Sequence, residues 1–197
     1  MQNVQLMAPV TSNLTDLMIG DIVHISGTIL TARDMAHLRM KEYLSERKQL
    51  PLEFKGAVIF HAGPVVEKVD EKYILRVIGP TTSIRMEPYT RMLGDIGVKA
   101  IIGKGGMGED TLAALQRIGG IYLQAPPGCA VKLAEGVKSI KQVHWLDLGV
   151  PEAIWVLEAK CFGPLIVGMD SQGKSLYQEV KEKALKKMQD MFIKTVN

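Results

Sequence analysis

Two kinds of hydrophobic pattern alternate along the chain. Short apolar runs rich in β-branched residues, each bounded by glycine, proline or polar residues, predict strands. Longer stretches whose apolar residues recur every three or four positions predict helices. The predicted strands cover residues 22–30, 57–60, 73–78, 97–102, 121–124, 140–145, 153–157 and 164–167, with 1–19 as a lead-in. The predicted helices cover about 31–49, 86–96 (starting near Ser83), 109–117, a short segment ending near Gly136, and 174–192. This mixture predicts an α/β (mixed) or α+β domain.

Capping and turn residues set the expected boundaries. Thr31 is predicted to cap the first helix, which should end near Gln49 because Pro51 cannot continue it. Residues 68–72 are predicted to form a hairpin turn. The last helix carries an apolar residue every four positions, and we expect this stripe to join the core while the lysines and glutamates face solvent: Leu176, Val180, Ala184 and Met188.

The composition is that of an ordinary globular protein. A chain of 197 residues can bury a sizeable core, and we expect one domain over residues 1–197. Apolar content of 47% and charged content of 23% are typical, and a net charge of +3 is too small to indicate a nucleic-acid partner. No apolar run is long enough to span a bilayer, and the N-terminus lacks the features of a signal peptide. We therefore expect no membrane association and a cytoplasmic location.

Cysteine and histidine usage indicates no complete metal site on this chain. Cys129 and Cys161 lie far apart without CxxC spacing, and we expect both to be reduced and at least partly buried. The four histidines are scattered. His61 follows a predicted strand and is more simply interpreted as a structural, hydrogen-bonded histidine than as a ligand.

Candidate chemistry first appears on the first predicted helix. Arg33 and His37 are four residues apart, so they share a face, and that face lies apart from the simplest apolar stripe. Two interpretations stay open. The pair is either an ordinary surface pair, or an anion clamp beside a group that can move protons near neutral pH.

The stretch from Gly79 to Glu87 is the most informative part of the chain. A strand breaks at Gly79-Pro80, and Thr81, Thr82 and Ser83 are residues that cap helix N-termini. Arg85 then falls in the first turn, where a cation opposes the helix dipole. A bound carboxylate would justify it; the alternative is a capped helix with a solvated arginine.

A glycine-rich loop follows the next strand. Residues 103–108 match the pattern G-x-G-x-x-G of dinucleotide-binding turns. However, the following strand ends in Gln124 rather than in an acid, and a lysine inside the turn is unusual. The spacing does not match a phosphate-binding P-loop either. We prefer a bare backbone loop that lets Lys104 approach a small anion, with a nucleotide- or phosphate-binding module as the alternative.

These features converge on an anionic ligand. Arg33, Arg85 and Lys104 are three cations with few acids nearby in sequence, and they lie with His37 and Thr81 at strand ends or helix starts. Sites cluster at such positions in α/β sheets. Guanidinium groups bind carboxylates in a bidentate manner, so a ligand with two carboxylates fits.

Six motifs occur in an order that resembles one enzyme family. They are residues 31–37 (TARDMAH), 61–64 (HAGP), 79–86 (GPTTSIRM), 103–107 (GKGGM), 127–130 (PGCA) and 165–170 (LIVGMD). Together, over residues 12–180, they resemble the β subunit, or C-terminal domain, of class I iron–sulfur fumarases and L(+)-tartrate dehydratases. Ala32 departs from the pattern, where bacterial members often carry Gly or Cys. This affects packing more than chemistry.

The resemblance implies a swivelling β/β/α domain, with mixed sheets and flanking helices, that closes over a [4Fe-4S] cluster. It also implies a hydro-lyase that interconverts fumarate and L-malate, or alternatively dehydrates L(+)-tartrate. Three cysteines of a separate α subunit would hold the cluster, so that no metal is ligated by this chain. An α2β2-type heteromer is implied, with a homodimer of this chain alone as the other arrangement.

The resemblance also implies roles for individual residues. Arg33, Arg85 and Lys104, together with Thr82, would bind the substrate carboxylates. Thr81 would be the base that removes a proton from carbon, and His37 would donate or relay a proton. A threonine hydroxyl is a weak base, so Thr81 would need cationic neighbours that favour its alkoxide.

Overall fold

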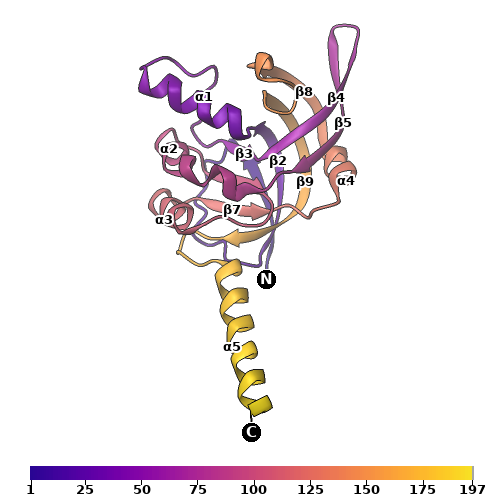
Figure 1. Ribbon diagram of the computed structural model, residues 1–197. Coiled ribbons are helices and arrows are strands. Elements are labelled where there is room, and N and C mark those ends of the chain that lie inside the picture. Colours follow the sequence, from indigo (N-terminus) through magenta and orange to yellow (C-terminus); the bar gives the residue numbers. More distant parts are fainter. Residues whose placement is uncertain (197) are drawn as a thin grey trace.

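A mixed sheet lies at the centre of the protein (Figure 1). The computed structural model describes the backbone of residues 1–196 and the side chains of residues 1–191, and in this part of the chain seven strands form one sheet. In spatial order they are β1 (Asn3–Ala8), β2 (Ile22–Thr31), β3 (Val58–Phe60), β6 (Ala100–Gly103), β7 (Ile121–Gln124), β9 (Ile154–Met169) and β8 (Val137–His144).

The sheet closes on itself into a small barrel. Strands β2, β3, β6 and β7 run parallel to one another, and β9 pairs antiparallel with β7 on one side and with β2 on the other. The ring β2–β3–β6–β7–β9 therefore has no free edge, which is the usual advantage of a closed sheet. Strands β1 and β8 extend this ring, pairing with β2 and β9 respectively.

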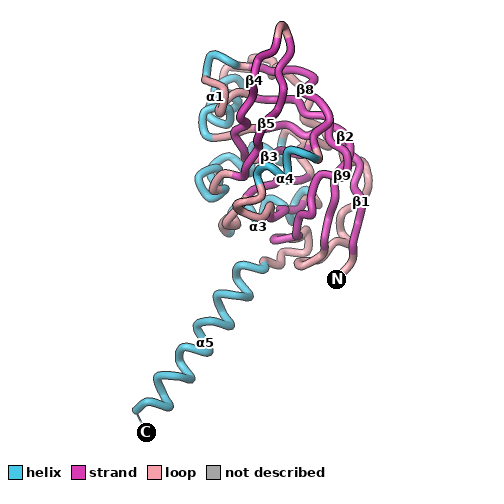
Figure 2. The backbone as a smooth tube through the Cα atoms, turned by 90° about the vertical axis from the view of Figure 1, so that its right-hand side faces the viewer, coloured by secondary structure: helices cyan, strands magenta, loops and turns pink. Residues whose placement is uncertain are grey.

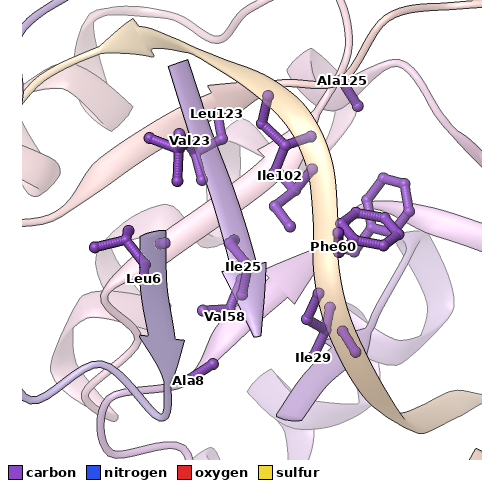
Figure 3. Packing of buried hydrophobic residues seen from close by; sticks show 14 of the residues in the cluster. Leu6, Ala8, Val23, Ile25, Ile29, Val58, Phe60, Ile102, Leu123 and Ala125 are labelled. Carbon is purple, nitrogen blue, oxygen red and sulfur yellow. The ribbon is translucent and has the colours of Figure 1, made fainter. Parts of the chain in front are cut away.

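Alternation of side chains along the strands gives two hydrophobic clusters, one on each face of the sheet. The cluster in Figure 3 fills one face, with Ile29, Val58, Phe60 and Ile102 fully buried. Their sequence neighbours point the other way and pack with the helices in the second cluster, which contains Leu30, Ile59, Ile101 and Tyr122.

The helices and a hairpin surround the barrel. The hairpin consists of β4 (Ala62–Val69) and β5 (Lys72–Pro80), and its turn lies within the segment predicted for it. The helices are α1 (Asp34–Ser45), the 3₁₀ helix η1 (Ser83–Tyr89), α2 (Thr90–Asp95), α3 (Glu109–Ile118), α4 (Ala130–Glu135), the 3₁₀ turn η2 (Leu146–Leu148) and α5 (Leu176–Val196). The predicted mixed α/β class with flanking helices is confirmed.

Several local predictions were wrong, each for a physical reason. The lead-in contains β1, which pairs in parallel with β2 and alternates exposed with buried residues, a period of two that the prediction overlooked. Residues 153–167 form the single strand β9, because the Gly163-Pro164 interruption is absorbed by irregular pairing with β2. Thr31 ends β2 instead of capping α1: its hydroxyl accepts a hydrogen bond from Trp155 N at 3.0 Å. Cys129 and Cys161 are both exposed rather than buried.

Helix α5 departs most from expectation. It projects away from the barrel in both views (Figures 1 and 2). Val180 and Met188 of the predicted core stripe are 57% and 48% exposed. The expectation that this apolar stripe joins the core is therefore wrong. Tyr177, in its first turn, does pack against the second cluster. Among the described residues, no helix is long and apolar enough to cross a membrane.

Candidate functional site

The predicted site residues gather at one end of the barrel. The parallel strands β2, β3 and β6 end at the same edge, and they are followed by Arg33, His61 and Lys104 respectively. Pairing of Ala62 with Pro80 brings the end of β5, and hence Thr81, to the same edge. A backbone bridge then places Thr82 beside Lys104. These residues therefore follow strand ends on one edge of the sheet, and their roles in a site stay a prediction.

Arg85 is held by a carboxylate of this chain. Its Nε and Nη2 atoms donate to Asp34 Oδ1 and Oδ2, both at 2.9 Å, and Nη2 also donates to Thr81 Oγ1 at 2.9 Å. This bidentate contact lowers the pKa of Asp34 and raises that of Arg85. Asp34 thus supplies the anion that an arginine at a helix start requires. Thr82 is the N-cap of η1, yet no side-chain capping bond forms there.

Arg33 lies deeper in the site than Arg85. Its Nη2 is 3.3 Å from Glu152 Oε1, and its side chain is 24% exposed. Its Nε atom is buried without a hydrogen-bond partner. The backbone of β4 lies close to the Arg33 guanidinium: a Cβ added at Gly63 would be only 2.8 Å from Arg33 Nη1. Arg33 is therefore confined between β4 and the Glu152 turn.

Lys104 begins the glycine-rich loop and is partly exposed. Gly105 and Gly106 follow with φ of +81° and +74°, a conformation that glycine adopts without strain. The backbone N–H of Ser83 donates to the Lys104 carbonyl at 3.1 Å, which ties this loop to the start of η1. Lys104 and the Thr81–Arg85 segment are thus neighbours.

The same loop is poorly suited to a nucleotide phosphate. In a dinucleotide-binding turn, the N-terminus of the following helix binds the phosphate. Here the Glu87 carboxylate occupies that position, accepting hydrogen bonds from Gly108 N at 2.8 Å and from Thr111 N at 2.9 Å. A phosphate would have to displace this carboxylate, so the local geometry argues against the nucleotide alternative.

His37 and His61 are both fully buried. Their rings meet edge to face with centroids 5.2 Å apart. His37 Nδ1 lies 2.7 Å from the Arg33 carbonyl and donates to it, whereas Nε2 of each ring is buried without a partner. The interpretation of Arg33 and His37 as a surface pair is therefore wrong. His61 is hydrogen-bonded through Nδ1 to Ser83 Oγ at 3.0 Å, as a structural histidine should be.

Burial of His37 should make the stability of the fold depend on pH. It lowers the pKa of the imidazole from 6.5 to about 4, and the pKa of His61 is lowered in the same way by burial and by His37. Between these values the unfolded chain binds a proton that the folded chain does not. The free energy of unfolding is therefore expected to fall as the pH drops from 6.5 towards 4, by about 3 kcal/mol for His37.

Urea unfolding at pH 7.0, 5.5 and 4.5 measures this dependence. The variant His37→Gln removes one of the two titrating histidines and should reduce the pH slope, leaving the part that His61 contributes. An unchanged pH slope in a folded His37→Gln variant would mean that His37 is not the group responsible.

The donor set of this chain does not fit an iron–sulfur cluster. Such clusters need several thiolates close together, and Cys129 and Cys161 are exposed, on the loop before α4 and on β9 respectively. Among the described residues, no group of three or more His, Cys, Asp or Glu side chains could hold a metal ion.

Sequence reasoning missed four contributors to the site. Asp34 was assigned no role from the sequence, although its position beside Arg33 in the TARDMAH motif could have marked it. Glu152 lies in a turn with no signal of its own. Ser83 and Glu87 carry capping chemistry, but their partners, His61 and the start of α3, are visible only in three dimensions.

Comparison with known proteins identifies the family of this chain. The family model described as "Fumarase C-terminus" matches residues 1–180, so the chain belongs to that family. A protein of Methanocaldococcus jannaschii named putative L(+)-tartrate dehydratase subunit beta is 45% identical over 180 residues, covering 89% of this chain and 91% of the relative. The L(+)-tartrate dehydratase subunit beta of Escherichia coli K12 is 42% identical, covering 86% and 84%.

A further relative has a different length. The putative fumarate hydratase class I of Geobacillus stearothermophilus is 40% identical over 191 residues. That match covers 94% of this chain but 35% of the relative, so this chain corresponds to one part of a longer polypeptide there.

Proposed function

We propose that this chain is the β subunit of a hydro-lyase acting on a C4 dicarboxylate, with the reversible hydration of fumarate to L-malate as the reaction. The observation that carries the proposal is the contact of Arg85 with Thr81 Oγ1, in a group of residues that also includes Arg33 and Lys104. The family membership and the names of the relatives support the same reaction class.

Each residue of the site has a definite task in this proposal. Arg33, Arg85 and Lys104, with the Thr82 hydroxyl, bind the two carboxylates of the substrate. Thr81 acts as its alkoxide: it takes the proton from the carbon next to one carboxylate and becomes the hydroxyl. Loss of this proton builds negative charge on that carboxylate. Fixed cations stabilise this charge more in the transition state than in the ground state.

Arg85 also favours the alkoxide form of Thr81, which is the form that can accept a proton. Its Nη2–H donates to Thr81 Oγ1, and a hydrogen bond to the charged form of a group favours that form. Asp34 holds the guanidinium in the orientation that this bond requires. His37 enters as the neutral imidazole, with Nδ1–H committed to the Arg33 carbonyl and Nε2 left as a proton acceptor.

The [4Fe-4S] cluster is assigned to a partner. Because the cysteines of this chain do not fit it, we place the cluster on an α subunit with three cysteine ligands, in an α2β2-type cytoplasmic heteromer in which residues 1–197 form one domain. The word "subunit" in the relatives' names supports a partner chain.

L(+)-tartrate dehydration is the second candidate. It is favoured by one observation: the relatives whose length matches this chain carry that name, whereas the fumarate hydratase relative is a longer polypeptide. Both substrates are C4 dicarboxylates, so the same cations would bind either one.

Anaerobic co-expression with the cluster-bearing partner chain tests the proposal. The purified complex is expected to hydrate fumarate, and a parallel assay with L(+)-tartrate decides between the two substrates. Turnover of neither substrate by a cluster-loaded complex would refute the proposal. Micromolar binding of NAD or ATP by the chain would instead support a nucleotide-binding module.

A further inference from the structure

A buried chain of hydrogen bonds runs beneath the candidate site. The Tyr122 hydroxyl donates to Ser83 Oγ at 3.1 Å, and Ser83 Oγ lies 3.0 Å from His61 Nδ1. All three residues have no exposed surface. They come from β7, from the start of η1 and from the residue after β3, so the chain links three elements that are distant in sequence.

Backbone bonds of the same residues reach the site directly. The His61 carbonyl accepts from Thr81 N at 2.7 Å, and Ser83 N donates to the Lys104 carbonyl at 3.1 Å. Ser83 therefore lies between the segment that carries Thr81 and Arg85 and the loop that carries Lys104. A shift of Ser83 would move these two segments relative to each other.

Packing leaves the glycine-rich loop that carries Lys104 little conformational freedom. A Cβ added at Gly103 would lie 1.8 Å from Ser83 Oγ, so the strand end fits directly against this hydroxyl. A Cβ at Gly106 would lie 2.6 Å from the ring of Tyr177, whose ring in turn meets Tyr122 with centroids 6.2 Å apart. The loop is thus held between Ser83 on one side and Tyr177 on the other.

Polar groups at these positions need an explanation beyond filling space. Hydroxyls removed from water lose hydration that an alanine and a phenylalanine would not have to give up. Hydrogen bonds between buried groups define one geometry more sharply than apolar packing does. In this network both hydroxyls and His61 Nδ1 are bonded, and His61 Nε2 has no partner. The geometry that this network defines is that of the candidate site.

We infer that Ser83 and Tyr122, together with His61, are positioning residues that fix Lys104 relative to Thr81 and Arg85. This inference rests on the proposed function, in which Lys104 binds a substrate carboxylate. The network itself does not touch the substrate: it acts through the Lys104 loop.

A double-mutant cycle on the enzyme assembled with its cluster-bearing partner tests this inference. Tyr122→Phe removes only the hydroxyl from the network. It is expected to raise KM for the dicarboxylate about tenfold while kcat stays within about twofold, because Lys104 contributes to substrate binding. In a Lys104→Met background, the same change should have little further effect on KM, since the residue through which it acts is gone.

Ser83→Ala is a second variant that cuts the same network at its centre, and it should behave in the same way. Tyr73→Phe and Ser139→Ala are matched controls outside the network, on β5 and β8 respectively, and should leave both constants unchanged. The thermal unfolding midpoint of each variant shows whether it is still folded at the assay temperature.

The outcomes distinguish a failure of the positioning role from a failure of the proposed function. An equal KM effect of Tyr122→Phe in both backgrounds, or an effect on thermal unfolding with no change in KM, overturns the positioning role alone. If Lys104→Met leaves kcat/KM unchanged, the assignment of Lys104 in the proposed function fails, and the positioning role fails with it.

Discussion

Replacing Arg85 by alanine is expected to lower kcat/KM for the C4 dicarboxylate by about a thousandfold in the assembled enzyme. Three interactions would be lost together: the bond to a substrate carboxylate, the hydrogen bond to Thr81 Oγ1 and the charge that balances Asp34. Steady-state assays of fumarate hydration and L(+)-tartrate dehydration measure the loss.

Arg76→Ala is the matched control for this variant. Arg76 also forms an ion pair with a carboxylate through Nε and Nη2, but its partner is Glu67 and the pair lies on the hairpin. Its removal is expected to leave kcat/KM unchanged. Arg85→Lys keeps the charge without the planar fork and should recover only part of the activity. Full activity of Arg85→Ala would refute the role of Arg85 in the site.

Replacing Thr81 by valine is expected to lower kcat by about a thousandfold or more, with KM nearly unchanged. Valine keeps the shape of the side chain and removes the hydroxyl, so only the proton transfer should suffer. The Asp34–Arg85 pair does not depend on Thr81 and should hold the Arg85 side chain in place. Single-turnover kinetics separate the chemical step from binding.

Thr81→Ser keeps a hydroxyl at the same position and should retain much of the activity. Thr28→Val makes the same change on β2, where Thr28 pairs with Glu158, and should have no effect on kcat. If Thr81→Val instead raises KM at constant kcat, Thr81 binds substrate but is not the base.

The central strands could be predicted from the sequence because their runs of apolar residues indicate which positions are buried. The run predicted at 22–30 is β2, Ile22–Thr31, and the one at 121–124 is β7. β7 is apolar because successive residues of it are buried on both faces, whereas β2 alternates half-buried and buried residues over its first four positions; each pattern is one that periodicity detects. In contrast, β1 is an outer strand whose side chains alternate between exposed and buried, with Val4, Leu6 and Ala8 turned inward. This period of two is present in the sequence, and the prediction of a lead-in overlooked it.

Part of the candidate site could also be predicted, because its residues follow recognisable strands. Arg33, Thr81 and Lys104 follow apolar strands and glycine-containing breaks, which places them at the sheet edge. Their partners could not be predicted: Glu152 is more than 100 residues from Arg33, and the bond of Ser83 to His61 depends on the pairing of β4 with β5. Likewise, the burial of His37 follows from the packing of α1, not from its spacing to Arg33.

Closure of the strands into a ring limits how the protein can move. Arg33, His61 and Lys104 follow strands that are hydrogen-bonded to one another within that ring, so they cannot separate unless backbone bonds of the barrel break. Any movement of this edge relative to another chain would therefore involve the ring as one rigid body. In amide hydrogen–deuterium exchange, β2, β3 and β6 should consequently exchange only through global unfolding, on the slowest timescale of the molecule.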